Sequence, residues 1–107
     1  MKRGALSLVR KPTGDAKSQR VFGVVGRQTV INSRFSTVIC APVYTRGDGL
    51  KTQVNIGPEC GLKHDSAIDC DDLASLSKSV LTDDDGTLSP APLESLKVAL
   101  RIALDIE

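Results

Sequence analysis

Short hydrophobic runs separated by turn residues make up most of the chain before its last twenty residues, and this pattern is typical of β-strands. Runs of strand length lie at residues 6–9, 21–25, 37–43, 51–56 and 66–70. The second and third runs are rich in β-branched residues, which predicts central and well-buried strands. In the fourth run apolar and polar residues alternate, as expected for a half-exposed strand.

The C-terminal part of the chain has the period of a helix instead. Ser89 offers an N-cap hydroxyl and Pro90 suits the first helical position, so we expect a helix that ends at about Leu104. Apolar residues at spacings of three and four form one face, which further apolar residues widen: Leu93, Leu96, Leu100 and Ala103, with Val98, Ala99 and Ile102. We expect this face to pack on the rest of the domain or on a partner.

The segments between these elements are predicted from their turn residues. Residues 10–19 contain Pro12 and Gly14 and predict an exposed basic loop. Residues 73–81 are compatible with a strand or with a single helical turn, and residues 83–86 predict a turn.

Length and composition indicate one globular domain that spans residues 1–107. With 40% hydrophobic and 25% charged residues, the chain has the profile of an ordinary folded protein. A domain of this size buries only about two thirds of its unfolded surface, so dimerisation would help to offset the entropy lost on folding. No apolar run approaches the roughly 18 residues that span a bilayer, and the N-terminus does not resemble a secretory signal. We therefore expect a cytoplasmic protein without a membrane segment.

The net charge of +1 hides a strong asymmetry along the chain. Residues 1–51 hold ten basic and two acidic residues, a balance of +8, whereas residues 52–107 hold four basic and eleven acidic residues, a balance of −7. Such a division can place a basic surface on one side of the domain, where it would suit a polyanion. Alternatively, the two halves interleave in space and form a solvated, salt-bridged surface.

The three cysteines are too few and odd in number for a disulfide scaffold, which predicts free thiols in a reducing compartment. Cys60, His64 and Cys70 could be considered as metal ligands, but they lack paired Cys-x-x-Cys spacing and a clear fourth ligand. We expect neither a metal nor another cofactor. Cys40 and Cys70 lie in apolar stretches, where cysteine behaves as a small hydrophobe.

Several stretches resemble the MazF/PemK toxin family in their order and spacing. The most specific runs from Phe35 to Val43, Phe-Ser-Thr-Val-Ile-Cys-Ala-Pro-Val, and is similar to the central strand of that family. The other matching features cover nearly the whole chain: Arg3-Gly4, Arg20, Asn32 twelve residues before Tyr44, Gly61-Leu62, Asp65-Ser66, and the segment from Leu88 to Leu104.

The resemblance implies a mainly β fold, a small SH3-like barrel of the CcdB/MazF type with a C-terminal α-helix. It also implies a homodimeric toxin of a type II toxin–antitoxin system, which cleaves single-stranded RNA without a metal. A cognate antitoxin would neutralise it, and we expect a flexible acidic segment of that partner to cover the basic groove.

The chain departs from the family pattern at two positions. Arg20 is followed by Val21 where relatives have proline, and Tyr44 occupies the position of the family threonine, with Thr45 next. Adjacent side chains of a strand point to opposite faces, so Thr45 can supply the missing hydroxyl only if the strand has ended or bulged there. Tyr44 could instead donate its phenol O–H to a phosphate oxygen.

Cleavage without a metal uses the ribose 2′-OH as the nucleophile, so the protein must stabilise charge on the phosphorane. Arg20 suits this task because its planar guanidinium can bind two phosphate oxygens. The alternative is a surface arginine that pairs with Asp15. The single histidine, His64, excludes a two-histidine mechanism within one subunit and is expected at the surface. Proton transfer then falls to Thr45, to Tyr44, to water or to an arginine.

Contacts to the RNA backbone are expected from the two loops that flank the central strands. The candidate residues are Arg10, Lys11, Lys17 and Gln19 in the first loop, and Arg34, Arg46 and Lys51 near the second. Aromatic residues are scarce and Phe22 and Phe35 are assigned to the core, so base recognition would depend on hydrogen bonds. The rival hypothesis is a non-catalytic barrel, either a CcdB-like gyrase inhibitor or a degenerate homologue that only binds antitoxin or RNA.

Overall fold

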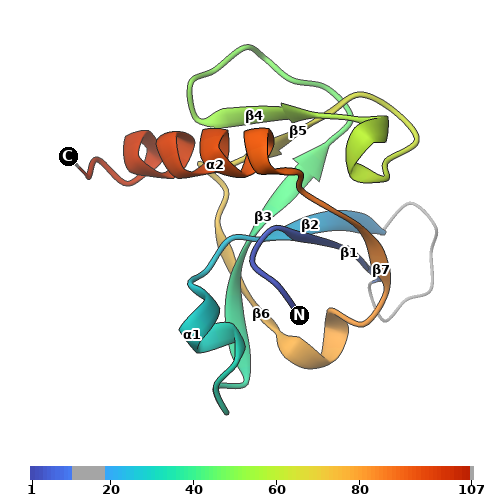
Figure 1. Ribbon diagram of the computed structural model, residues 1–107, viewed down its shortest axis with the longest axis vertical. Helices are drawn as coiled ribbons and strands as arrows, with labels where there is room; N and C mark the ends of the chain where they lie inside the picture. The colour runs from blue at the N-terminus through green and yellow to red at the C-terminus, as the bar shows by residue number, and fades with distance from the viewer. Residues whose placement is uncertain (11–18, 107) are drawn as a thin grey trace.

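Antiparallel strands form the body of the protein in the computed structural model, which describes residues 1–10 and 19–106 (Figure 1). The strands are β1 (Ala5–Val9), β2 (Arg20–Val24), β3 (Thr37–Tyr44), β4 (Gln53–Ile56), β5 (Ser66–Asp69), β6 (Ala74–Ser77) and β7 (Asp84–Thr87). The helical elements are α1 (Gln28–Ile31), the 3-10 turns η2 (Pro58–Cys60) and η3 (Lys78–Val80), and the long helix α2 (Pro90–Ala103). The five predicted strands and the C-terminal helix are all present.

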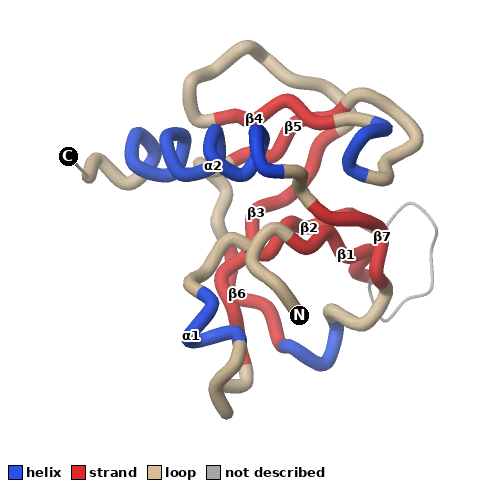
Figure 2. Tube along the Cα trace, viewed as in Figure 1, coloured by secondary structure: helices blue, strands red, loops and turns tan. Residues whose placement is uncertain are grey.

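The long strand β3 connects two parts of one curled sheet. The strand order is β4-β5-β3-β2-β1-β7, and every pairing is antiparallel. One edge of β3 pairs with β2, whereas its other edge pairs first with β6 and then, at Val43 and Tyr44, with β5. Figure 2 shows the strands curling around the interior while α2 lies across one end. The result is a half-barrel with a C-terminal helix, which confirms the predicted fold class.

Helix α2 closes the larger of two apolar clusters. Leu96 and Ala99 are buried, and Leu93, Leu100 and Ala103 pack partly buried against the same cluster, as predicted. Val98 and Ile102 remain 56% and 45% exposed, so at these two positions the apolar face does not pack on the described part of the chain. The helix advances about 100° per residue, which turns both side chains away from the Leu96 stripe.

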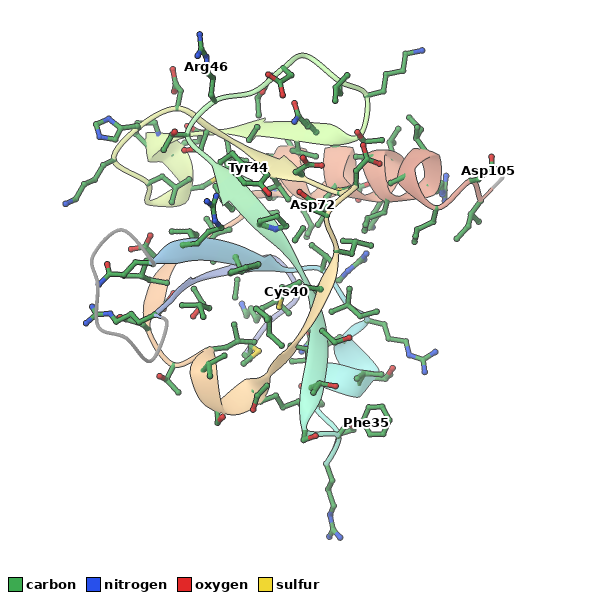
Figure 3. All side chains as sticks on the ribbon, turned by 180° about the vertical axis from the view of Figure 1, so that it is seen from behind. Phe35, Cys40, Tyr44, Arg46, Asp72 and Asp105 are labelled. Atoms are coloured by element: carbon green, nitrogen blue, oxygen red, sulfur yellow. The ribbon has the colours of Figure 1, made fainter. Side chains whose placement is uncertain are left out.

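The smaller cluster fills the space between β2, β3 and α1. Its buried members are Val24, Ile31, Val38, Cys40 and Leu81. Phe22 packs against this cluster, as predicted, but Phe35 is 68% exposed and is not a core residue. Phe35 precedes the first residue of β3 and its ring points outward from the end of that strand (Figure 3).

The segment after β5 differs from the sequence prediction in one element. Residues 73–81 hold both expected alternatives, the strand β6 followed by the 3-10 turn η3. Residues 83–86 were expected to be a turn, whereas Asp84–Thr87 is the strand β7, which pairs with β1. β7 lies at the edge of the sheet, where Asp84 is exposed and Asp85 half-buried, so the polar sequence is tolerated there.

The short helical elements α1 and η2 were not predicted. Gln28 anchors α1, because its side chain accepts a hydrogen bond from the Arg3 N–H and donates to the Met1 carbonyl. No helix in the described ranges is long and apolar enough to cross a membrane.

Candidate functional site

Arg20 and Tyr44 face each other across two neighbouring strands. β2 and β3 are paired with Phe22 opposite Pro42, and continuing this register by two residues places Arg20 opposite Tyr44. The exposed guanidinium lies over the phenol ring, with its central carbon 4.6 Å from the ring centroid. A cation over an aromatic face is attracted by about 0.5–1 kcal/mol at an exposed site, so the ring helps to hold Arg20 in place.

The Tyr44 hydroxyl is fixed by a carboxylate from the other side of β3. It donates a hydrogen bond of 2.7 Å to Oδ2 of Asp72, an exposed residue in the connection between β5 and β6. Figure 3 shows the two side chains side by side near the end of β3. We call Arg20, Tyr44 and Asp72 the guanidinium–phenol–carboxylate cluster.

The environment raises the pKa of Tyr44 above its ordinary value of 10.0. The hydrogen bond to Asp72 is the largest cause, followed by partial desolvation and the negative charges of Asp72 and Asp69, while Arg20 acts in the opposite direction. Tyr44 is therefore a neutral phenol near pH 7. Its one proton points to Asp72, so an incoming phosphate would meet the lone pairs of the phenol oxygen and the N–H groups of Arg20.

Arg20 retains its capacity to bind an anion. Within residues 1–10 and 19–106 its side chain forms no salt bridge. Stacking on Tyr44 occupies one face of the guanidinium and does not use its N–H donors. The alternative partner named from the sequence, Asp15, lies outside the described residues.

Thr45 occupies a different surface from this cluster. β3 ends at Tyr44, and the exposed Thr45 lines a hollow of about 510 Å³. That hollow is polar and includes Asn55, Asp65 and Ser66, but neither Arg20 nor Tyr44 lines it. Of the two hydroxyls considered from the sequence, the structure places that of Tyr44 beside Arg20.

The predicted RNA-binding residues do not form one continuous surface. Lys11 and Lys17 lie outside the described residues, and Gln19 directly precedes Arg20. Arg34 precedes the first residue of β3, whereas Arg46 and Lys51 follow its last residue. A strand of eight residues is about 26 Å long, so the structure separates Arg34 from Arg46 and Lys51.

The basic and acidic halves of the chain interleave, which is the second of the two alternatives drawn from the charge pattern. β1 pairs with β7, and Arg10 forms a salt bridge of 3.1 Å with Asp83. Arg10 is therefore partly neutralised. Arg20, by contrast, is separated from Asp72 by the ring of Tyr44.

The thiols and the single histidine lie apart from this chemistry. All three cysteines are free and buried, and burial raises the pKa of Cys40 to about 11. His64 is exposed. In the part of the chain that the structure describes, no group of three or more His, Cys, Asp or Glu side chains could hold a metal ion.

Sequence analysis missed Asp72. It belongs to an acidic run with Asp69 and Asp71, and nothing in the sequence distinguishes the three carboxylates. The geometry separates them: Asp71 accepts a hydrogen bond of 2.6 Å from the Thr52 hydroxyl, and Oδ1 of Asp69 accepts one of 2.9 Å from the Asp71 N–H. The strand register pairs Tyr44 with Ala67 and leaves Asp72 in the connection after β5, so the contact with Tyr44 is visible only in three dimensions.

An apolar hollow of about 860 Å³ lies on another part of the surface, between the first half of β3 and the end of α2. Its lining includes several exposed apolar side chains, namely Phe35, Ile39, Leu104 and Ile106. Contiguous apolar surface of this kind is uncommon on a monomer, so this hollow is a candidate interaction surface.

The curled antiparallel sheet with one C-terminal helix defines a class of small β proteins, and comparison with known proteins identifies the family within it. Residues 2–104 match the model of the PemK-like, MazF-like toxin of type II toxin-antitoxin systems. The chain therefore belongs to this toxin family. No curated protein matches it by sequence.

Solved structures of related proteins share the fold at low sequence identity. The Mycobacterium tuberculosis toxin MazF-mt6 is 22% identical, with a TM-score of 0.82 over 96% of this chain and 98% of that one. A mycobacterial endoribonuclease in complex with its cognate antitoxin is 21% identical, with a TM-score of 0.85 over 100% and 97%. MazF of a MazE-MazF complex from Deinococcus radiodurans is 17% identical, with a TM-score of 0.76 over 100% and 97%.

Proposed function

We propose that this toxin is a sequence-specific endoribonuclease that cleaves single-stranded RNA in the cytoplasm without a metal ion. The observation that supports this proposal best is the exposed guanidinium of Arg20, which lies over the ring of Tyr44 and forms no salt bridge within residues 1–10 and 19–106. Structural neighbours named as mycobacterial endoribonucleases agree with it. Thr45 is left as a contact of the adjoining polar hollow rather than a partner of Arg20.

The proposed chemistry is attack of a ribose 2′-OH on the adjacent phosphate, which expels the 5′-oxygen and leaves a 2′,3′-cyclic phosphate. Charge accumulates on the non-bridging oxygens as the phosphorane forms. Arg20 would donate two parallel hydrogen bonds to these oxygens, a geometry that lysine cannot reproduce. Gln19, Arg46 and Lys51 would contact neighbouring parts of the RNA backbone.

The proposal is tested by incubating purified protein with a long single-stranded RNA in EDTA. Discrete fragments are expected from the wild type, and Arg20→Ala should slow their formation by about two to three orders of magnitude. Arg20→Lys should recover little of this loss, because an ammonium group cannot donate two parallel hydrogen bonds to the phosphate.

Lys63→Ala is the matched control, since it removes one positive charge at an exposed residue between η2 and β5 that lines neither the apolar nor the polar hollow. It should leave cleavage unchanged. RNA that stays intact with folded wild-type protein would overturn the nuclease and favour a non-catalytic binding toxin, and equal loss in both variants would remove the special role of Arg20.

For partners, we propose a homodimer and a cognate antitoxin. A second copy of the chain would cover the exposed apolar side chains of the hollow between β3 and α2, which a domain of this size has reason to bury. The antitoxin would place a flexible acidic segment along Arg20 and the neighbouring basic residues, where it would compete with RNA. Neighbours titled as toxin–antitoxin complexes agree with such a partner.

A further inference from the structure

Tyr44, at the position of the family threonine, brings the carboxylate of Asp72 into the site. Tyr44 extends further from β3 than a threonine would, and its hydroxyl reaches Asp72 at 2.7 Å. The hydroxyl proton is therefore committed to Asp72 and not available to a phosphate. The same ring supports the Arg20 guanidinium at 4.6 Å, so one side chain links the cation to the carboxylate.

We infer that Asp72 is a positioning residue and the final proton acceptor of a relay, in which Tyr44 takes the proton of the ribose 2′-OH while it passes its own proton to Asp72. This inference rests on the proposed nuclease function and names how its base step works. Tyr44 touches the substrate, whereas Asp72 acts only through Tyr44.

In the relay, two protons move while one P–O bond forms and another breaks. The 2′-O–H bond breaks as its proton moves to the phenol oxygen, the phenol O–H proton moves to Oδ2 of Asp72, and the freed 2′-oxygen forms a bond to phosphorus. The P–O5′ bond breaks, and the 5′-oxygen takes a proton from water. Tyr44 is already a neutral phenol after the transfer, with the proton of the 2′-OH. Asp72 then releases its proton to the hydroxide left in the solvent, which restores the carboxylate that accepts the hydrogen bond of Tyr44.

A relay explains the geometry better than a tyrosine acting alone. The raised pKa of Tyr44 keeps it protonated near neutral pH, so the phenol can accept a proton only if it gives up its own in the same step. The charged groups that face the phenol are Arg20 of β2, Asp69 of β5 and Asp72. Of these, Asp72 alone makes a hydrogen bond with the hydroxyl.

The first test compares turnover of single-stranded RNA by Asp72→Asn, Asp72→Glu, Tyr44→Phe and the double variant Tyr44→Phe/Asp72→Asn. Asp72→Asn and Tyr44→Phe should each lower kcat by about 100-fold, the size expected of a base. The double variant should lose no more than either single variant, because both changes break one relay. Asp72→Glu keeps a carboxylate and should recover part of the loss.

Asp105→Asn is the control for the loss of one negative charge. Asp105 lies beyond the end of α2, away from Tyr44 in Figure 3, and has a φ of 53°, a conformation that asparagine tolerates. It should leave kcat unchanged. Binding of 2′-O-methyl RNA, which cannot be cut, should be as tight or tighter for Asp72→Asn, because a negative charge is removed; a purely structural role would weaken it.

The pH profile gives a second readout. Wild-type activity should fall in alkali, because Tyr44 then loses the proton that it passes to Asp72. The hydrogen bond to Asp72 raises the pKa of Tyr44, so this fall should begin at a lower pH in the residual activity of Asp72→Asn.

The hydrogen bond itself is testable without RNA. Tyr44 is the only tyrosine and the chain has no tryptophan, so the near-ultraviolet absorbance of tyrosinate reports this residue alone. The Tyr44 pKa should be above 10 in the wild type and lower in Asp72→Asn. An unchanged pKa, or undiminished turnover by Asp72→Asn with active wild type, overturns the relay and leaves the nuclease standing. Wild-type protein that cuts no RNA removes both.

Discussion

At the scale of single residues, the candidate site follows from strand register. Arg20 was selected through the resemblance to the MazF/PemK family, and antiparallel pairing of β2 with β3 places it opposite Tyr44. The sequence left Tyr44 and Thr45 as alternatives, because it did not show where β3 ends. β3 ends at Tyr44, which would have allowed Thr45 to turn toward Arg20, but Thr45 lines the polar hollow and the ring beneath the guanidinium is that of Tyr44.

Residues that depend on distant contacts were beyond the reach of the sequence. Asp72 meets Tyr44 only because β5 pairs with the last residues of β3 and delivers the following connection beside it. Phe35 was assigned to the core on its hydrophobicity, yet no neighbouring element among the described residues covers it. Both cases require tertiary information that local patterns do not contain.

Gly86 provides a prediction at this scale. Its φ of 144° lies in the region that favours glycine, and a Cβ there would collide with the carbonyl of Cys60. Gly86→Ala should therefore lower the free energy of unfolding by about 2 kcal/mol or more, through backbone strain together with displacement of η2 from β7.

Gly49→Ala is the matched control, because Gly49 also has a positive φ, 73°, but nothing lies within 4 Å of its added Cβ. It should cost only about 1 kcal/mol. Urea denaturation measures the free energy of unfolding of both variants. Equal decreases would show that the contact with Cys60 does not affect stability in solution.

At the scale of elements, hydrophobic periodicity predicted the strands and the helix that bury one face in the core. The β-branched runs became the central strands β2 and β3, and the spacing of Leu93, Leu96 and Leu100 became the packed face of α2. β7 was missed because an edge strand of acidic residues has no hydrophobic alternation. The short α1 and η2 are held by specific contacts, such as those of Gln28, rather than by a repeating pattern.

The packing of α2 leads to a second prediction. Leu96 is fully buried beneath the helix, so Leu96→Ala should lower the free energy of unfolding by about 2–5 kcal/mol through lost contacts and a residual cavity. Val98→Ala, two residues away and 56% exposed on the other side of the helix, should change it by less than about 0.5 kcal/mol. Chemical denaturation distinguishes the two, and a similar cost for both would mean that α2 packs in a different rotation.

At the scale of the whole molecule, the fold brings the basic first half of the sequence against the acidic second half. β1 lies against β7, and β3 lies between β2 and the connection that holds Asp72. The surface is therefore a mosaic, and among the described residues Arg20 is set apart by the position of its guanidinium over the ring of Tyr44. A polyanion would be recognised at this point and at the nearby loops, rather than over one broad basic face.

The proposed mechanism predicts which chemical groups the protein leaves at the ends of the RNA fragments. Attack by a 2′-OH leaves the phosphate on the 3′ end of the upstream fragment, whereas metal-assisted attack by water would leave a free 3′-OH there. The most direct measurement is to map and chemically identify the fragment ends produced from single-stranded RNA in EDTA. The account predicts 2′,3′-cyclic phosphate and 5′-OH ends at recurring sequences; intact RNA, or ends with 3′-OH and 5′-phosphate, would contradict it.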